Sequence, residues 1–228
     1  MKKISFCTTC KGRLWQLIQT LPENILKTKE NEIDILILDY HSDDGLENYI
    51  TRNYKKYLED KRLKYFKLIT EVKGFDMAFS KHIIHLLAEG DVLFNLDADN
   101  TIGPYSINSL SNLPKDKILI PKMIKDTDTS RCGRIGIHKE NYLLIGGYDK
   151  TIRGMAGDDG DLIRRCYLRG IRGLQNPDKE IPIQQSREEK SKYLFQNPEQ
   201  LPDSVEVKDF FNTVYVVDLK ASKVYIKP

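Results

Sequence analysis

Two apolar runs in the sequence each end in an aspartate: Ile33-Asp34-Ile35-Leu36-Ile37-Leu38-Asp39 and Val92-Leu93-Phe94-Asn95-Leu96-Asp97. Their length and their content of apolar residues are typical of strands that are buried on both faces of a sheet. Amphipathic helical patterns separate the strand-like segments of the first hundred residues. The chain therefore predicts βαβ units and a parallel sheet.

Strand and helix patterns also occur on both sides of these two runs. We expect strands at Ile4–Thr8, Ile33–Leu38, Leu63–Ile69, Val92–Leu96, Thr213–Leu219 and Lys223–Ile226, and helices at Arg13–Leu26, Asp44–Leu58, Phe75–Ala88 and Asp158–Leu168. Asp44 is expected to cap the helix that it begins. The predicted fold class is α/β, with a mostly parallel central sheet flanked by helices and a small C-terminal α+β extension.

Composition excludes several classes of protein. The 228 residues are 40% hydrophobic and carry 36 basic against 33 acidic side chains, a net charge of +3. This balance excludes a disordered chain and gives no argument for nucleic-acid binding. The chain has no apolar run of about 18 residues that would span a membrane, and Met1 leads directly into a strand pattern without a signal-peptide core. We expect a cytoplasmic protein.

The cysteines and histidines give weaker signals. Cys7 and Cys10 form a C-x-x-C, but no second pair stands at zinc-binding spacing. A redox role stays open, although we favour a structural one, with Cys7 ending a strand and Cys10 in the loop that follows. His82 and His85 lie three residues apart on a predicted helix, and we expect them at the surface or at the edge of the core.

Carboxylates follow the two most strongly predicted strands. Asp39 ends the first, and Asp97-Ala98-Asp99 follows the second. In an open parallel sheet, ligands bind beyond the carboxyl ends of the strands. The i, i+2 spacing of Asp97 and Asp99 places both side chains on one side of an extended segment, and carboxylate oxygens suit Mg²⁺ or Mn²⁺. The alternative is a pair of solvated loop acids.

Four segments together give the sequence a resemblance to a known family. They are Ile4–Arg13, Ile35–Gly45, Asp97–Asp99, and Gly146-Gly147-Tyr148-Asp149 with Gly157-Asp158-Asp159-Gly160-Asp161. In order and spacing these segments resemble the GT-A-fold glycosyltransferases of the inverting family 2 type, with a galactosyltransferase-like C-terminal motif. The resemblance implies a Rossmann-like GT-A fold and transfer of a sugar from a nucleotide-sugar donor.

The resemblance also implies roles for individual residues. Donor-binding residues would be Thr8, Arg13, Asp39, Lys81 and Asp97. Asp97 and Asp99 would hold Mn²⁺ or Mg²⁺, Asp159 would be the general base, and Asp158 and Gly147 would contact the acceptor. The alternative for Asp158, Asp159 and Asp161 is that they only decorate a helix N-terminus.

The chain departs from the family pattern at several points, among them His82 in place of the asparagine that often follows the basic residue at Lys81. Met155-Ala156 stands where relatives have an aromatic residue, and no histidine follows His138 to serve as a third metal ligand. The basic residues between positions 52 and 67 suit either a solvated helix face or anionic lipid. Peripheral association with the inner face of the membrane is therefore an expectation that depends on a lipid-linked acceptor.

The resemblance, together with the paired carboxylates, implies a metal-dependent inverting glycosyltransferase. We expect residues 1–175 to form the catalytic domain, with a nucleotide-sugar-binding half at 1–100 and an acceptor-side half at 101–175. Residues 176–228 would be an extension packed on the same domain. The expected partners are a nucleotide-sugar, with a UDP-sugar favoured, and a glycan or glycolipid acceptor, with no nucleic acid. The alternatives are a non-catalytic nucleotide-sugar-binding module and a sugar-phosphate nucleotidyltransferase.

Overall fold

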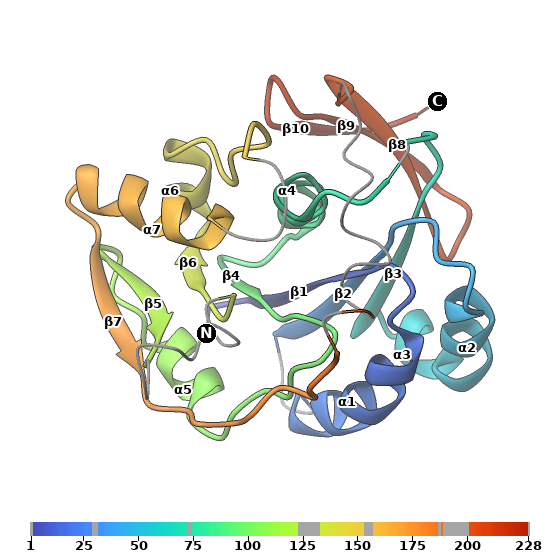
Figure 1. Ribbon diagram of the computed structural model, residues 1–228, viewed down its shortest axis with the longest axis horizontal. Helices are drawn as coiled ribbons and strands as arrows, with labels where there is room; N and C mark the ends of the chain where they lie inside the picture. Colours follow the sequence, from blue (N-terminus) through green and yellow to red (C-terminus); the bar gives the residue numbers. More distant parts are fainter. Residues whose placement is uncertain are drawn as a thin grey trace.

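The computed structural model describes residues 2–28, 32–72, 74–122, 133–152, 157–186, 188 and 201–227. Within these ranges, the strands form one sheet in the order β10-β9-β8-β3-β2-β1-β4-β6-β5-β7 (Figure 1). The strands are β1 (Ile4–Cys10), β2 (Ile33–Asp39), β3 (Leu63–Leu68), β4 (Val92–Asn95), β5 (Lys117–Pro121), β6 (Gly136–His138), β7 (Arg172–Asn176), β8 (Ser204–Asp209), β9 (Val214–Asp218) and β10 (Lys223–Ile226). The helices are α1 (Leu14–Lys27), α2 (Leu46–Asn53), α3 (Lys55–Glu59), α4 (Met77–Leu87), α5 (Ser106–Ser111), α6 (Lys139–Leu144) and α7 (Asp158–Leu168).

The centre of the sheet is parallel, as the sequence predicts. Strand β1 pairs in parallel with β2 and β4, and β2 pairs in parallel with β3. Antiparallel neighbours extend this centre on both sides, with β8 on β3 and β6 on β4. The predicted α/β class, with helices flanking a central sheet that is parallel in its core, is confirmed.

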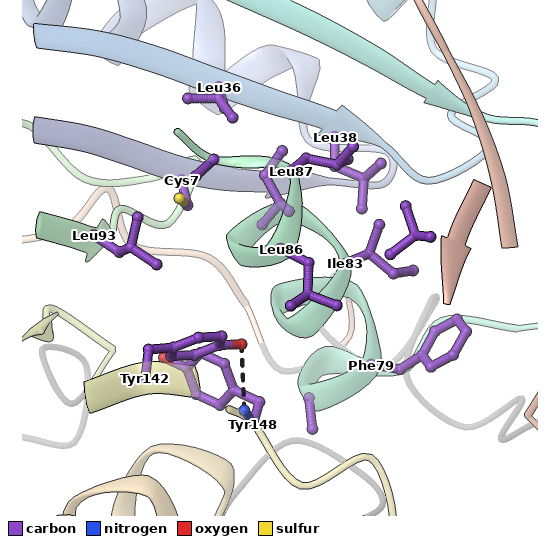
Figure 2. Close-up of a cluster of buried hydrophobic side chains, with 14 of the residues drawn as sticks. Cys7, Leu36, Leu38, Phe79, Ile83, Leu86, Leu87, Leu93, Tyr142 and Tyr148 are labelled. Carbon is purple, nitrogen blue, oxygen red and sulfur yellow. Dashed lines mark hydrogen bonds between the residues drawn. The ribbon is translucent and has the colours of Figure 1, made fainter. Parts of the chain in front are cut away.

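Alternate residues of the central strands supply two separate cores. On one face, Cys7, Leu36 and Leu93 pack against α4 (Figure 2). On the other face, Phe6 and Ile35 pack with residues of α1 and α2. Successive side chains of a strand point to opposite faces, so an unbroken apolar run fills both cores at once. This explains why these strands read as continuous apolar segments.

Strand β1 is two residues longer than predicted. The sequence placed Cys10 in a loop, but Cys10 pairs with Asp39 in the β1–β2 ladder and is fully buried. Cys7 and Cys10 are three residues apart on a strand, so their side chains belong to opposite faces and to different cores. Both are free thiols, and this geometry supports the structural role over a redox C-x-x-C.

The single helix predicted at Asp44–Leu58 is wrong in two respects. The segment forms α2 and α3, which are separated at Tyr54, where the backbone leaves the helical region (φ −123°, ψ 19°) and the side chain packs beside Tyr49 and Tyr57. Gly45, at φ +88°, precedes α2. Asp44 does not cap α2. Its Oδ2 instead accepts a hydrogen bond at 2.8 Å from the backbone N–H of Leu14, the first residue of α1.

The C-terminal residues 204–226 contribute three further strands to the sheet. Strands β8, β9 and β10 form antiparallel ladders that extend the sheet outward from β3. Across the ranges that the structure describes, no helix combines the length and the apolar character needed to cross a membrane.

Candidate functional site

The carboxyl ends of β1, β2 and β4 bring several predicted site residues to one edge of the sheet. Thr8 lies inside β1, and its hydroxyl donates a hydrogen bond to the carbonyl oxygen of Leu96 at 2.7 Å. This contact fixes the chain just before Asp97. Thr8 is buried, so in this structure it holds the loop after β4 in place.

Asp97 and Asp99 extend from that loop and are both partly exposed. Asn95, two residues before Asp97, donates from Nδ2 to Asp97 Oδ1 at 3.0 Å and to the carbonyl of Gly133 at 2.8 Å. Gly133 leaves room for the other oxygen, because a Cβ at that position would come within 2.5 Å of Asp97 Oδ2. Asn95 and Gly133 therefore set the orientation of the first carboxylate.

These two carboxylates suit a metal that shares its coordination with a substrate. Among the described residues, no group of three or more histidine, cysteine, aspartate or glutamate side chains is arranged to hold a metal ion. Mg²⁺ in nucleotide enzymes is typically bound through one or two carboxylates, with substrate phosphates and water completing the shell. Asp97 and Asp99 fit that mode, and the cradle at Gly133 keeps Asp97 Oδ2 uncrowded.

Asp39 lies at the same edge, but both of its carboxylate oxygens accept hydrogen bonds from other groups of the protein. Its Oδ2 accepts a hydrogen bond from the hydroxyl of Tyr65 at 2.5 Å, and its Oδ1 accepts one from the backbone N–H of Ser42 at 2.7 Å. Its side chain is buried, and burial raises the pKa of Asp39 although both hydrogen bonds oppose that shift. The geometry gives Asp39 the role of fixing the loop that follows β2.

A segment far along the chain forms a wall beside this edge. The backbone N–H of Ile183 donates to the carbonyl of Asp99 at 2.9 Å, and Gln16 Nε2 donates to the carbonyl of Ile183 at 3.1 Å. Arg13, a predicted donor contact, donates to Gln185 Oε1. Figure 1 shows the chain after β7 running past α5 toward α1. No local pattern in the sequence indicated this contact between residues 176–186 and the Asp97–Asp99 loop.

Lys81 joins the second group of predicted residues. This α4 side chain is 3% exposed, and its Nζ lies 2.8 Å from Asp158 Oδ2 and 2.8 Å from Asp159 Oδ1. Burial alone would lower the pKa of Lys81, but the carboxylates of Asp159, Asp97 and Asp158 together raise it above its ordinary value. The structure therefore places Lys81 between the acids of α7 and the Asp97 loop, a contact that the sequence did not predict.

The three acids at the start of α7 have different partners. Asp161 accepts hydrogen bonds from Arg164 at 2.8 Å and from Arg165 at 2.6 Å, within its own helix, and these lower the pKa of Asp161 although burial opposes the shift. Asp158 and Asp159 instead face Lys81. Burial raises the pKa of Asp158 against the opposing charge of Lys81. The alternative that these acids only line the first turn of a helix fits Asp161. It does not fit Asp158 and Asp159, which are paired with Lys81 from another helix.

His82 and His85 are buried in the core, so the prediction that they lie at its edge or on the surface is wrong. His85 donates from Nδ1 to the carbonyl of Lys81 at 2.7 Å and stacks on Tyr142, while His82 Nδ1 lies 2.9 Å from the Tyr142 hydroxyl. Burial lowers the pKa of His82 to about 4 and that of His85 to about 3. Both rings are therefore neutral near pH 7 and serve as packing behind Lys81.

Gly147 packs against this aromatic cluster. Its φ is +67°, and an added Cβ would lie 2.5 Å from His82 Nδ1 and 2.7 Å from Tyr142 Cζ. The turn that contains it leads to Tyr148, whose backbone N–H donates to the Tyr142 hydroxyl at 3.3 Å (Figure 2). In this structure Gly147 shapes the chain that carries Tyr148. Met155 and Ala156, where the sequence departs from the family pattern, lie outside the described residues.

We expect Gly147→Ala to lower the free energy of unfolding by roughly 2–5 kcal/mol, because left-handed strain and overpacking add together. Gly146→Ala is the matched control, since Gly146 also has a positive φ (+81°) but no atom within 4 Å of an added Cβ. That control should lose only about 1–2 kcal/mol from backbone strain. Urea unfolding measures both values, and equal losses would contradict the packing argument.

Comparison with solved structures identifies the fold as GT-A. The mannosyltransferase PcManGT from Pyrobaculum calidifontis, in complex with GDP-Man and Mn²⁺, matches with a TM-score of 0.61 at 14% identity, over 78% of this chain and 55% of that one. S. aureus TarS 1-349 gives a TM-score of 0.60 at 15% identity, over 78% and 58% of the two chains. GalNAc-T7 with UDP, GalNAc and Mn²⁺ gives 0.59 at 15%, over 78% and 43%.

At 14–15% identity, these similarities identify the fold of the chain and do not identify its activity. The chain covers less than two thirds of the length of each of these three structures. No protein-family model matches the sequence, and no curated protein matches it either. The predicted GT-A fold is confirmed.

Proposed function

We propose that this protein is a metal-dependent glycosyltransferase that moves a sugar from a nucleotide-sugar donor to a hydroxyl group of an acceptor. The observation that carries this proposal is the pairing of two carboxylate centres on a GT-A fold. Asp97 and Asp99 follow β4 at the sheet edge, and Asp158 and Asp159 begin α7, with Lys81 bonded to the second pair and attracted by Asp97 of the first. This arrangement gives one centre for the donor and one for the acceptor.

The donor centre has the groups that a nucleoside diphosphate requires. Asp97 and Asp99 would hold Mn²⁺ or Mg²⁺, and the bound ion would stabilise the charge of the departing diphosphate. Arg13 is linked to this loop by the segment 176–186. Its side chain is hydrogen-bonded to Gln185, and Ile183 of the same segment is bonded to Asp99. We propose Arg13, Asp97 and Asp99 as the direct donor contacts. Thr8 and Asp39, which use their side chains inside the protein, would hold the loops after β4 and β2 in place.

The acceptor centre has a base with access to solvent. The side chain of Asp159 is 14% exposed, against 5% for Asp158. In the reaction, the acceptor oxygen bonds to the anomeric carbon while the bond from that carbon to the diphosphate breaks. Asp159 takes the proton of the acceptor hydroxyl, which is general-base catalysis. Attack from the face opposite the leaving group inverts the anomeric centre, and Asp158 keeps Lys81 in place.

The donor and the acceptor can be proposed by class. The solved relatives hold UDP, UDP-GlcNAc or GDP-Man, and we favour a UDP-sugar here. A glycan or glycolipid is the proposed acceptor, and association with the inner face of a membrane would accompany the lipid-linked form. The rival functions are a binding module without turnover and a nucleotidyltransferase. The partly exposed carboxylate of Asp159 at the start of α7 supports an enzyme that uses a base over both rivals.

Thermal unfolding with nucleotides tests the proposal. We expect UDP or GDP with Mn²⁺ to raise the melting temperature, because a ligand that binds only the native state stabilises it by mass action. The panel holds UDP, GDP and CDP and their common sugar conjugates, each with and without Mn²⁺. No shift with any nucleotide would count against the donor site. Formation of pyrophosphate from UTP and a sugar phosphate would instead identify a nucleotidyltransferase.

A further inference from the structure

Asp159 is held by one of its two carboxylate oxygens. Among the described residues, the Nζ of Lys81 and the hydroxyl of Tyr148 both donate to Oδ1, at 2.8 Å and 3.1 Å. We propose that Lys81 and Tyr148 are positioning residues, which fix Asp159 through Oδ1 so that Oδ2 is presented to the acceptor hydroxyl. This inference rests on the proposed function, in which Asp159 is the base.

Lys81 can hold a fixed geometry because its surroundings leave it little freedom. It lies in α4, is almost fully buried, and contacts Asp158 and Asp159 at the same distance. A buried ammonium group is costly unless it is paired and hydrogen-bonded, so the two carboxylates and Lys81 restrain one another. Its backbone is fixed as well, since its carbonyl accepts the hydrogen bond from His85.

Tyr148 approaches Asp159 from a different element. Its side chain is buried, and its ring lies 5.2 Å from the Nζ of Lys81, which adds a cation–π contact. Burial and the neighbouring Asp159 raise the pKa of Tyr148, so its hydroxyl keeps its proton and can only donate to the carboxylate. Figure 2 shows Tyr148 beside Tyr142, to which its backbone N–H is bonded. The hydroxyl is therefore presented from a rigid core.

Two donors on one oxygen restrict rotation of the carboxylate. A general base takes a proton through a lone pair on an oxygen that the substrate can reach, and that oxygen must be within hydrogen-bond distance of the reacting hydroxyl. Anchoring Oδ1 from two directions leaves Oδ2 for this purpose. Catalytic geometry of this kind depends on surrounding hydrogen bonds that hold the reactive group within about 0.5 Å of its productive position.

The resemblance described above implies a different role for Lys81, as a contact of the donor diphosphate. The two roles make different predictions. Loss of a diphosphate contact weakens nucleotide binding and raises the donor KM. Loss of a positioning contact lowers kcat while the donor KM and the nucleotide-dependent thermal shift stay unchanged.

The central experiment uses Tyr148→Phe, which removes only the hydroxyl group. Release of nucleoside diphosphate from UDP-GlcNAc and GDP-Man with Mn²⁺ is followed, with water and with glycan mixtures as acceptors. We expect kcat to fall by about 10-fold or more, since hydrogen bonds to charged groups are among the stronger ones. Tyr215→Phe is the matched control, because it removes a Tyr–Asp hydrogen bond of the same length, 3.1 Å to Asp209, far from the site.

Lys81→Arg and Lys81→Met extend the test to the second donor. We expect Lys81→Met to lower kcat more than Tyr148→Phe does, and Lys81→Arg to restore part of the loss, with nucleotide-dependent thermal shifts retained in both. Wild-type kcat in Tyr148→Phe would overturn the positioning role of Tyr148. A lost nucleotide shift in folded Lys81→Arg would overturn that of Lys81 and make it a donor contact. If the wild-type protein neither releases nucleoside diphosphate nor responds to nucleotides, the proposed function itself fails.

Discussion

Replacing Asp159 with asparagine is expected to lower the rate of sugar transfer by about 10²–10⁴-fold, the usual contribution of a general base. The asparagine side chain has nearly the same shape, and its oxygen can still accept the hydrogen bonds that Lys81 and Tyr148 now make to Asp159. It cannot take a proton from the acceptor hydroxyl. The loss should therefore fall on kcat, while nucleotide binding and the melting temperature stay near the values of the wild-type protein.

Asp161→Asn is the matched control for this experiment. Asp161 lies in the same first turn of α7, but its carboxylate is bonded to Arg164 and Arg165. This variant should keep wild-type turnover and lose at most a little stability, because i,i+3 and i,i+4 ion pairs within a helix each contribute only about 0.2–0.5 kcal/mol. If Asp159→Asn turned over donor and acceptor as fast as Asp161→Asn, the assignment of the base would be wrong.

The second large effect is expected at the other carboxylate centre. The double variant Asp97→Ala/Asp99→Ala should lose the Mn²⁺-dependent part of nucleotide binding and reduce transfer by roughly 10²–10³-fold, since charge stabilisation by a metal is worth several kcal/mol. The reason is that no group of three or more potential ligands in the described parts of the chain offers a replacement. Thermal unfolding with UDP or GDP, with and without Mn²⁺, separates the metal-dependent shift from nucleotide binding alone.

Asp60→Ala provides the control for removal of a carboxylate. Asp60 is exposed at the end of α3, away from the sheet edge. Its loss should leave the Mn²⁺-dependent shift and the transfer rate unchanged. A full Mn²⁺-dependent shift in the double variant would show that the metal binds elsewhere. The donor centre would then need other ligands, and the roles of Asp97 and Asp99 would be reduced to shaping the loop.

The sequence predicted the centre of the fold because the signals there are local. The apolar runs of β2 and β4 fill cores on both sides of the sheet, so apolar residues occupy successive positions in most of each strand. Helix α7 begins and ends at the predicted residues, Asp158 and Leu168, since a cluster of acids marks its first turn. The break at Tyr54 was missed because nothing in the spacing of its neighbours differs from a continuous helix.

The sequence predicted which residues belong to the candidate site, but it did not predict most of the contacts between them. The motifs located the Asp97–Asp99 pair and the acids of α7, and the strand pattern placed the first pair at the carboxyl edge of the sheet. The partner of those acids was not predictable, because Lys81 and Asp158 are 77 residues apart. For the same reason the wall formed by residues 176–186 and the burial of His82 and His85 were not foreseen.

The sequence by itself therefore determined the parallel α/β centre and the carboxylates that lie at the carboxyl edge of its strands. Apolar periodicity and short motifs are local properties, and each follows from a few neighbouring residues. The tertiary structure alone decided that Lys81 and Tyr148 meet Asp159, that Asp39 is bonded to Tyr65, and that Asp44 is bonded to the first residue of α1. These hydrogen bonds join residues from separate elements, so their partners are set by how the helices and strands pack.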